Sequence, residues 1–298
     1  MRGTVAGAEM SKAINYLYAF IKVYPNRIHE LTDHLDGVEA SDIRYQLTIS
    51  ALGLAGTEES EGELVRLGHR FEADSSKLGA IIQSMGVAKT PGKNIEEFLL
   101  HSKRNLTNQR LRGVTYLALG NVSNGVRAED RERAEGIVEL LTSELRSVKD
   151  PGIIITALGN TRSVSVVEPI SEFLDHGRSD IRALSARSLR HVKTKLSDRF
   201  LRDLAATDAS FKVRQEAIRA MGTGSVSHDQ LEFQKDRLAI EENEVIRADI
   251  VRIVWKNREE YKMAESIVRD AAINDKSVEV QKVARVLLQE DGIFLPLK

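Results

Sequence analysis

Residues 208–222 of the chain read DASFKVRQEAIRAMG, and this stretch decides the fold. Ile218 and Met221 are three residues apart, which places both side chains on one face of an α-helix. Gly222 follows directly, and glycine commonly ends a helix because it adopts the left-handed conformation at low cost. Asp208 stands six residues before Arg214. The stretch therefore predicts a short helix with one apolar face and an acidic residue ahead of it.

A similar ending, a small residue, a large apolar residue and then glycine, occurs five times along the chain, and three further segments complete the series without the glycine. The third residues of these segments, the anchors, are Gly53, Gly86, Gly120, Gly159, Arg190, Gly222, Trp255 and Leu288. Successive anchors are 31 to 39 residues apart, and the longest interval contains a polar insertion at 121–127. Self-similarity at such a period is the signature of a repeat architecture. The spacing of the anchors therefore predicts eight repeat units of about 34 residues.

Two columns of apolar residues support this register. The residue before each anchor is Leu52, Met85, Leu119, Leu158, Leu189, Met221, Val254 or Leu287. The residue four places before each anchor is Ile49, Ile82, Tyr116, Ile155, Ala186, Ile218, Val251 or Ala284. Only 42% of the chain is hydrophobic, so two unbroken apolar columns fit chance poorly. Because both columns lie on one helix face, we expect them to form the core.

A second apolar-periodic segment stands upstream of the anchor helices, as at 64–67, 137–141, 200–204 and 267–271. Each unit thus reads as helix–turn–helix, and stacked neighbours would bury the apolar stripes that one unit leaves open. We predict an all-α fold, a right-handed α-α superhelix of about eight helical hairpins. It would form one solenoid domain over 1–298, with an N-terminal capping helix region at 1–35, repeats at 36–290 and a tail at 291–298.

Arginine recurs eight residues before the anchor, at Arg112, Arg182, Arg214 and Arg247. With Asp208 six residues ahead of Arg214, this pattern resembles the HEAT repeat, in which Asp and Arg columns stack between adjacent units. His176, Glu241 and Asn274 take the Asp position in other units. The resemblance implies a partial structural ladder that consists of Arg112, Arg182, Asp208, Arg214 and Arg247.

A second resemblance covers about residues 40–255. Its motifs, in order, are LAGTE at 54–58, LRGVTYLALG at 111–120, ALGN at 157–160, VEPI at 167–170 and VRQEA at 213–217. Their order and spacing are similar to the helical superhelix of the large lipid transfer proteins, the vitellogenin and microsomal triglyceride transfer protein family. That resemblance implies a lipid-associated partner. The chain lacks the β-sheets and disulfides of that family, so a lipid cavity does not carry over.

Composition narrows the function classes. The chain has 298 residues and no Cys, which excludes disulfides, thiol catalysis and Cys-built metal sites. It shows no signal peptide and no apolar run long enough to span a membrane, which slightly favours the cytoplasm. Its 43 basic residues balance 44 acidic ones, yet residues 101–200 carry 17 basic against 12 acidic residues. That excess in the middle fits either a partner-facing patch or an unselected property of a solvated surface, which is the more common case.

Motifs for chemistry are absent from the sequence. HELTDH at 29–34 misses the spacing of four that brings two histidines to one metal, and TPGK at 90–93 lacks the glycine-rich lead of a phosphate loop. No nucleophile elbow or paired acid motif stands out. We therefore expect no catalytic activity, no cofactor and no metal.

Residues 178–195 are rich in basic side chains, with Asp180 as the one acidic residue. Setting aside Arg182, the candidate partner-binding residues are Arg178, Arg187, Arg190, Lys193 and Lys195. We interpret the chain as a scaffold or protein-binding module whose partner is another protein with an acidic or extended segment. One alternative is a helical subunit of a lipid-transport assembly. Another is a nucleic-acid binder through the basic middle repeats, which the lack of interleaved aromatic residues disfavours.

Overall fold

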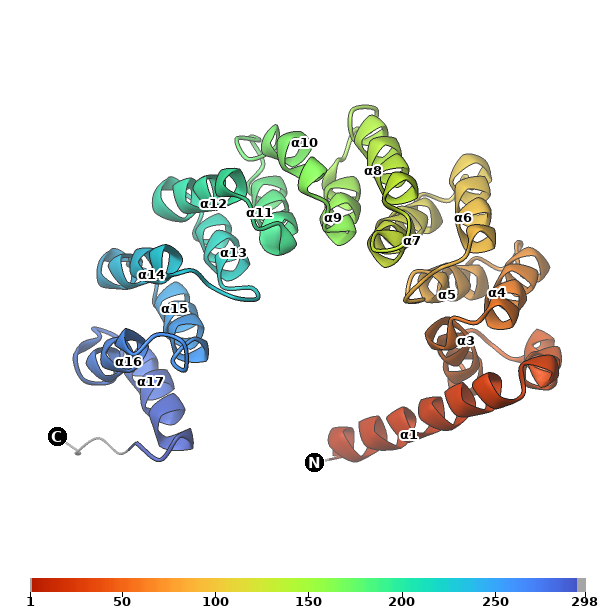
Figure 1. Cartoon of the computed structure of the whole chain (residues 1–298), viewed down its shortest axis with the longest axis horizontal. Coiled ribbons are helices and arrows are strands. Elements are labelled where there is room, and N and C mark those ends of the chain that lie inside the picture. Colours follow the sequence, from red (N-terminus) through yellow and green to blue (C-terminus); the bar gives the residue numbers. More distant parts are fainter. Residues whose placement is uncertain (1, 294–298) are drawn as a thin grey trace. The chain divides into compact units, whose positions relative to one another are not determined.

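The computed structural model describes the backbone of residues 2–293 and the side chains of residues 9–293. The described residues form seventeen α-helices and four 3₁₀ turns, and they contain no β-strand (Figure 1). The predicted all-α fold of helical hairpins is therefore confirmed. Contacts divide the chain into unit 1, Met1–Ser163, and unit 2, Val164–Lys298. The single domain over 1–298 stays a prediction, and most of the predicted tail at 291–298 lies outside the described residues.

Unit 1 contains the N-terminal hairpins. Its elements are α1 (Arg2–Val23), η1 (Pro25–Arg27), α2 (His29–Thr32), η2 (Asp33–Gly37), α3 (Ile43–Ala55), α4 (Glu58–Arg70), α5 (Ser75–Met85), α6 (Lys93–Asn105), α7 (Gln109–Val126), α8 (Arg131–Leu145) and α9 (Gly152–Thr161). Helices α1, α3, α5, α7 and α9 pack side by side in one layer. Helices α4, α6 and α8 cover them in a second layer.

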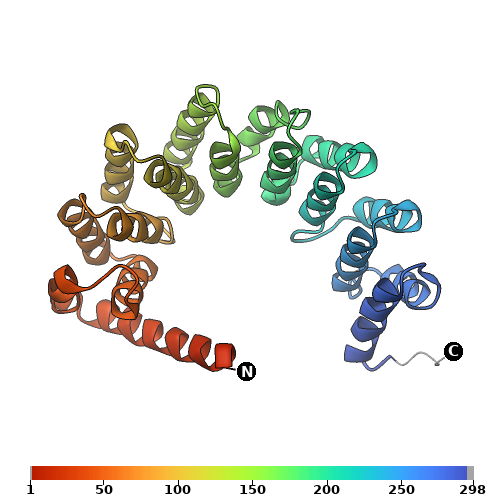
Figure 2. The same ribbon diagram turned by 180° about the vertical axis from the view of Figure 1, so that it is seen from behind.

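Unit 2 repeats the arrangement, as Figure 2 shows from behind. Its elements are η3 (Val164–Val166), α10 (Val167–Ser171), α11 (Ser179–Ser188), η4 (Leu189–His191), α12 (Lys195–Thr207), α13 (Phe211–Met221), α14 (His228–Ile240), α15 (Glu244–Lys256), α16 (Met263–Asn274) and α17 (Val278–Glu290). Helices α11, α13, α15 and α17 pack on one another in one layer. We call this layer the inner layer of the unit. Helices α10, α12, α14 and α16 form its outer layer.

The two apolar columns lie in the core. Every member is buried except Leu287, which is half-buried, whereas its neighbour Leu288 is fully buried. The register predicted for the last unit is therefore wrong by one residue. The same shift moves Asp275 into the position that the sequence pattern assigned to Asn274, and Asp275 is the residue that pairs with Arg247.

The prediction that the anchor glycines end helices in the left-handed conformation is wrong for Gly222 and Gly120. Gly222 has φ −76°, and α7 continues past Gly120 through most of the polar insertion at 121–127. A Cβ atom on Gly120 would instead collide with the backbone oxygen of Ala157 in α9. Glycine is therefore needed at this anchor because α7 and α9 approach each other closely.

Candidate functional site

A ladder of ion pairs joins the hairpins of unit 2. The Arg214 guanidinium donates to both carboxylate oxygens of Glu241, with Nε 3.1 Å and Nη2 2.9 Å from them. Its Nη1 donates to the backbone oxygen of Asp208 at 3.0 Å. Each arginine thus holds the turn before its own helix and the acidic residue of the following hairpin. A planar guanidinium suits this task because it donates in a fork that matches a carboxylate.

The same geometry recurs on both sides of Arg214. Arg182 pairs with Asp208 at 2.7 and 2.9 Å and donates to the His176 carbonyl at 2.8 Å. Arg247 pairs with Asp275 at 3.0 and 2.9 Å and donates to the Glu241 carbonyl at 3.1 Å. Where an arginine would come next, Gln281 donates to the Asp275 carbonyl at 2.7 Å. The ladder therefore runs through four successive hairpins and ends at α17.

The ladder is a structural element of the core. The side chains of Arg247 and Asp275 are only 3% and 6% exposed. Burial, the largest influence on Glu241, favours its protonated form, but hydrogen bonds from Arg214, the Asn243 backbone and Arg237 lower its pKa to about 2. The carboxylate therefore stays ionised at neutral pH. Because these charges face one another inside the stack, they are not offered to a partner.

Arg112 differs from the other ladder candidates. It lies in the corresponding position of α7, but it donates to the Tyr116 hydroxyl at 3.3 Å rather than to an acidic side chain. Its buried Nε has no hydrogen-bond partner. Tyr116 in turn donates to Glu144 at 2.8 Å, and Glu144 pairs with Lys103. A tyrosine thus stands between the arginine and the carboxylate that would complete a rung.

The five candidate partner-binding residues do not form one surface. Arg178 pairs with Asp180 at the start of α11, and Lys195 begins α12 in the outer layer. Arg190 donates to the Arg187 carbonyl at 3.2 Å, so it is tied to the end of α11. Lys193 donates to the Met221 carbonyl at 3.3 Å, and desolvation lowers its pKa. Arg187 alone among them projects from the inner layer as an exposed side chain.

The inner layer aligns Arg187 with two arginines outside that stretch. Arg187, Arg219 and Arg252 each stand three residues before an anchor, on α11, α13 and α15. The side chains of Arg219 and Arg252 are 48% and 53% exposed. Both contact Asp249, at 2.9 and 3.2 Å, whereas no described side chain forms an ion pair or hydrogen bond with the Arg187 guanidinium. We call these three residues the arginine column.

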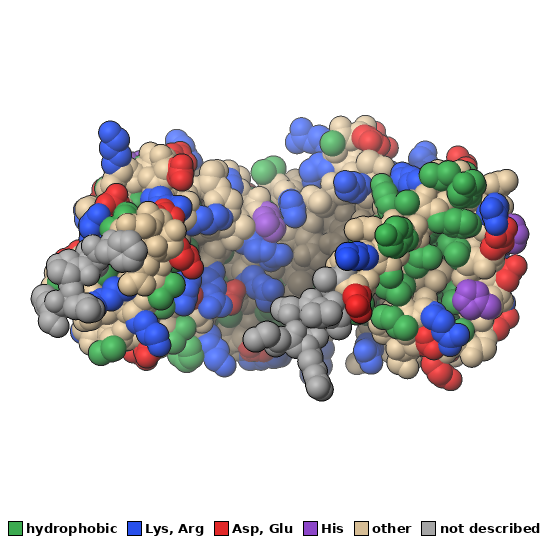
Figure 3. Space-filling model, turned by 90° about the horizontal axis from the view of Figure 1, so that it is seen from below, with side chains coloured by type: hydrophobic (Ala, Val, Ile, Leu, Met, Phe, Trp, Pro, Cys, Tyr) green, Lys and Arg blue, Asp and Glu red, His purple; other side chains and the backbone are tan. Residues whose placement is uncertain are grey.

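A groove of about 410 Å³ lies beside the column, between α11 and α13. Its walls include Ala183, Leu184, Arg187, Phe211 and Lys212. Phe211 is 43% exposed and offers an aromatic ring on one wall of the groove. Figure 3 shows the side chains by type in a view from below, and blue Lys and Arg side chains gather in the middle of the face seen there. The site thus combines cationic groups with an apolar floor.

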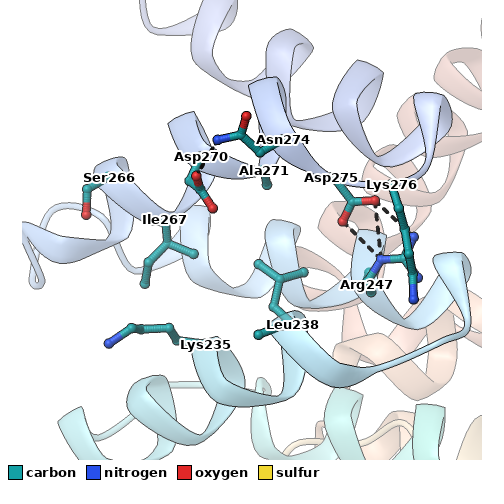
Figure 4. Close-up of a pocket in the computed structure, with 11 residues that line it drawn as sticks. Lys235, Leu238, Arg247, Ser266, Ile267, Asp270, Ala271, Asn274, Asp275 and Lys276 are labelled. Carbon is teal, nitrogen blue, oxygen red and sulfur yellow. Dashed lines mark hydrogen bonds and ion pairs between the residues drawn. The ribbon is translucent and has the colours of Figure 1, made fainter.

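A second cavity of about 510 Å³ lies between the outer helices α14 and α16 (Figure 4). Leu238 and Ile267 face each other across it, and Arg247 and Asp275 close one end with their ion pair. On its rim, Lys235 pairs with Glu232, and Asp270 accepts from Asn274. Arg247, Lys235 and Asp270 thus already have partners within the chain, so the inner groove is the stronger candidate site.

Comparisons with known proteins agree with this architecture. Residues 134–222 match the HEAT repeats family. The X-ray structure of YibA from E. coli resembles the chain with a TM-score of 0.50 at 16% identity, over 87% of this chain and 91% of that one. No curated protein matches the sequence. The chain is a HEAT-like helical repeat protein.

Two further solved structures show weaker likeness. The complex of CpcE and CpcF of phycocyanin lyase from Nostoc matches with a TM-score of 0.46 and 15% identity, over 87% of this chain and 93% of that one. Human deoxyhypusine hydroxylase in complex with glycerol matches with a TM-score of 0.36 and 14% identity, over 96% of this chain and 97% of that one. The second resemblance described above stays a prediction.

No helix among residues 2–293 is both long and apolar enough to cross a membrane. Within the same residues, no three His, Asp or Glu side chains come together in a way that could hold a metal ion.

Proposed function

We propose that the chain is a non-catalytic protein-binding module and that the inner layer of unit 2 binds an acidic, extended segment of another protein. The arginine column carries this proposal. It repeats one cationic residue at the same place on three successive helices, so a segment that crosses the helices meets a guanidinium on each. Stacked repeats commonly bind partners along such an extended surface.

The charges around the column support an anionic partner. Arg187, Arg219, Arg252 and Lys212 lie beside three acidic residues, Asp180, Glu216 and Asp249. Asp180 is paired with Arg178 at the start of α11. Asp249 is shared by two arginines and only 8% exposed, so it orients their guanidinium groups without covering them. The result is an excess of positive charge with unused N–H donors. Such a patch attracts an acidic segment and speeds its association.

The groove explains why a protein segment is favoured over other anions. Leu184, Ala183 and Phe211 offer an apolar contact next to Arg187. A side chain of a peptide can fill this groove while neighbouring carboxylates meet the arginines. A lipid-transport role would instead need sheets from another chain, and lipid that purifies with the protein would be its sign. A duplex DNA probe tests the nucleic-acid alternative, since it would bind with a steep dependence on salt.

We expect the Arg187→Glu substitution to weaken binding of a fluorescent polyglutamate peptide by about tenfold, because reversal replaces attraction by repulsion. Arg187 makes no side-chain hydrogen bond or ion pair within the described chain, so folding should be unchanged. Fluorescence anisotropy at low and high salt measures the affinity. Arg219→Glu should act in the same direction. Arg190, another of the candidate residues, serves less well as a test position, because its guanidinium donates to the Arg187 carbonyl at the end of α11.

Arg199→Glu is the matched control. This arginine lies on the outer helix α12 with a side chain 75% exposed, so its reversal changes net charge by the same amount on the other layer. Equal weakening by Arg187→Glu and Arg199→Glu, or binding that ignores both substitutions, would contradict the proposed site. Tighter binding of duplex DNA than of polyglutamate would favour the nucleic-acid alternative.

A further inference from the structure

We infer that the partner segment takes the polyproline II conformation and carries an acidic residue at every third position. This inference rests on the proposed function and adds the conformation and spacing of the segment. It follows from the interval at which the arginine column repeats, compared with the intervals at which regular peptide conformations present side chains on one side.

The column repeats once per inner helix. Helices α11, α13 and α15 pack directly on one another, and packed helix axes are typically about 8–10 Å apart. Because Arg187, Arg219 and Arg252 occupy equivalent positions, their backbone positions repeat at about the same interval. A partner that meets all three arginines must therefore present a carboxylate about every 8–10 Å along one side.

The three regular conformations present side chains at different intervals. A polyproline II helix has three residues per turn and rises about 3.1 Å per residue, so every third side chain returns to the same side after about 9.3 Å. A β-strand returns after about 6.6 Å, and an α-helix after about 5.4 Å per turn. The polyproline II interval matches the spacing of the helices. Its unpaired backbone also needs no strand partner, and the described part of this chain offers no sheet edge.

The groove beside Arg187 fits the residues between the acidic positions. Phe211 is exposed on one wall, with Ala183 and Leu184 on the facing helix. Polyproline II segments dock their proline rings into grooves lined by aromatic residues, because both partners are already rigid and lose little entropy. A proline that follows the acidic residue bound at Arg187 would lie over this groove. We therefore expect a segment that alternates one acidic residue with two positions rich in proline.

Three peptides of identical composition test the spacing: EPPEPPEPP, EPEPEPPPP and EEEPPPPPP. All three favour polyproline II, so only the placement of the glutamates differs. Titration calorimetry or anisotropy with the full chain should show EPPEPPEPP binding roughly tenfold tighter than the other two, because it alone can meet three arginines at once. The preference should shrink with Arg252→Glu, which removes the third contact, and persist with the control Arg199→Glu.

The outcomes separate this inference from the proposed function. Equal affinity for the three peptides, each weakened by Arg187→Glu, overturns the spacing and leaves the binding surface in place. Binding of polyglutamate without binding of EPPEPPEPP also overturns the spacing. If neither polyglutamate nor any of the three peptides binds in a way that depends on Arg187, the proposed function falls together with this inference.

Discussion

Replacing Arg247 by alanine is expected to lower the free energy of unfolding by about 3–5 kcal/mol, the usual cost of breaking a buried ion pair from one side. The substitution leaves the carboxylate of Asp275, 6% exposed, without its guanidinium partner. It also removes the donor to the carbonyls of Glu241 and Glu242. The first loss falls between two hairpins and the second in the turn that precedes α15, so the effect reports how strongly one rung of the ladder stabilises unit 2.

Urea unfolding followed by far-ultraviolet circular dichroism measures the change. Arg199→Ala is the matched control, because that arginine is exposed on α12 and its ion pair with Asp203 is long, at 3.9 Å. We expect the control to stay within about 0.5 kcal/mol of the unmodified chain. If Arg247→Ala were as mild as the control, the ladder would contribute little to the stability of unit 2.

Truncation of the anchor column should be comparably costly. Leu158→Ala in unit 1 and Leu189→Ala in unit 2 are each expected to lower the free energy of unfolding by about 2–5 kcal/mol, because a cavity remains where the side chain was. Both leucines are 0% exposed. Thermal and urea unfolding of the two variants measure the effect separately for each unit.

Glu139 provides the reference position for these truncations. It is exposed on α8, so Glu139→Ala should change the free energy of unfolding by no more than about 0.5 kcal/mol. Similar small effects at Leu158, Leu189 and Glu139 would mean that the anchor column does not form the core, and that the register of the repeats is wrong.

The apolar columns could be predicted from the sequence because burial in a helical repeat imposes a period that the residues themselves display. The register of the last repeat unit could not be predicted in the same way. Val286, Leu287 and Leu288 are consecutive and apolar, and the pattern does not say which one faces inward. The ion pair of Arg247 with Asp275 decides it. The role of Gly120 could not be predicted from the sequence either, because the Ala157 backbone oxygen that leaves no room for a side chain belongs to another helix.

The candidate site was only partly accessible from the sequence. The sequence pattern predicted a binding patch at residues 178–195 because their basic residues lie close together along the chain. The chain turns from α11 into α12 within this stretch, so Arg187 and Lys195 lie in different layers. The residues of the arginine column, in contrast, are more than thirty residues apart along the chain. Only the stacking of the helices brings them together. Comparing the residue three places before each anchor would have shown it.

Hydrogen–deuterium exchange of the full chain, with and without saturating polyglutamate, tests the central claim most directly because it locates the bound segment. The proposed function predicts slower exchange in α11, α13 and α15, with the outer helices α12, α14 and α16 unchanged. The same experiment on the Arg187→Glu variant should lose the protection at α11 and α13. Protection confined to the outer layer or to unit 1, or protection of α11 and α13 that persists in the variant, would contradict the account.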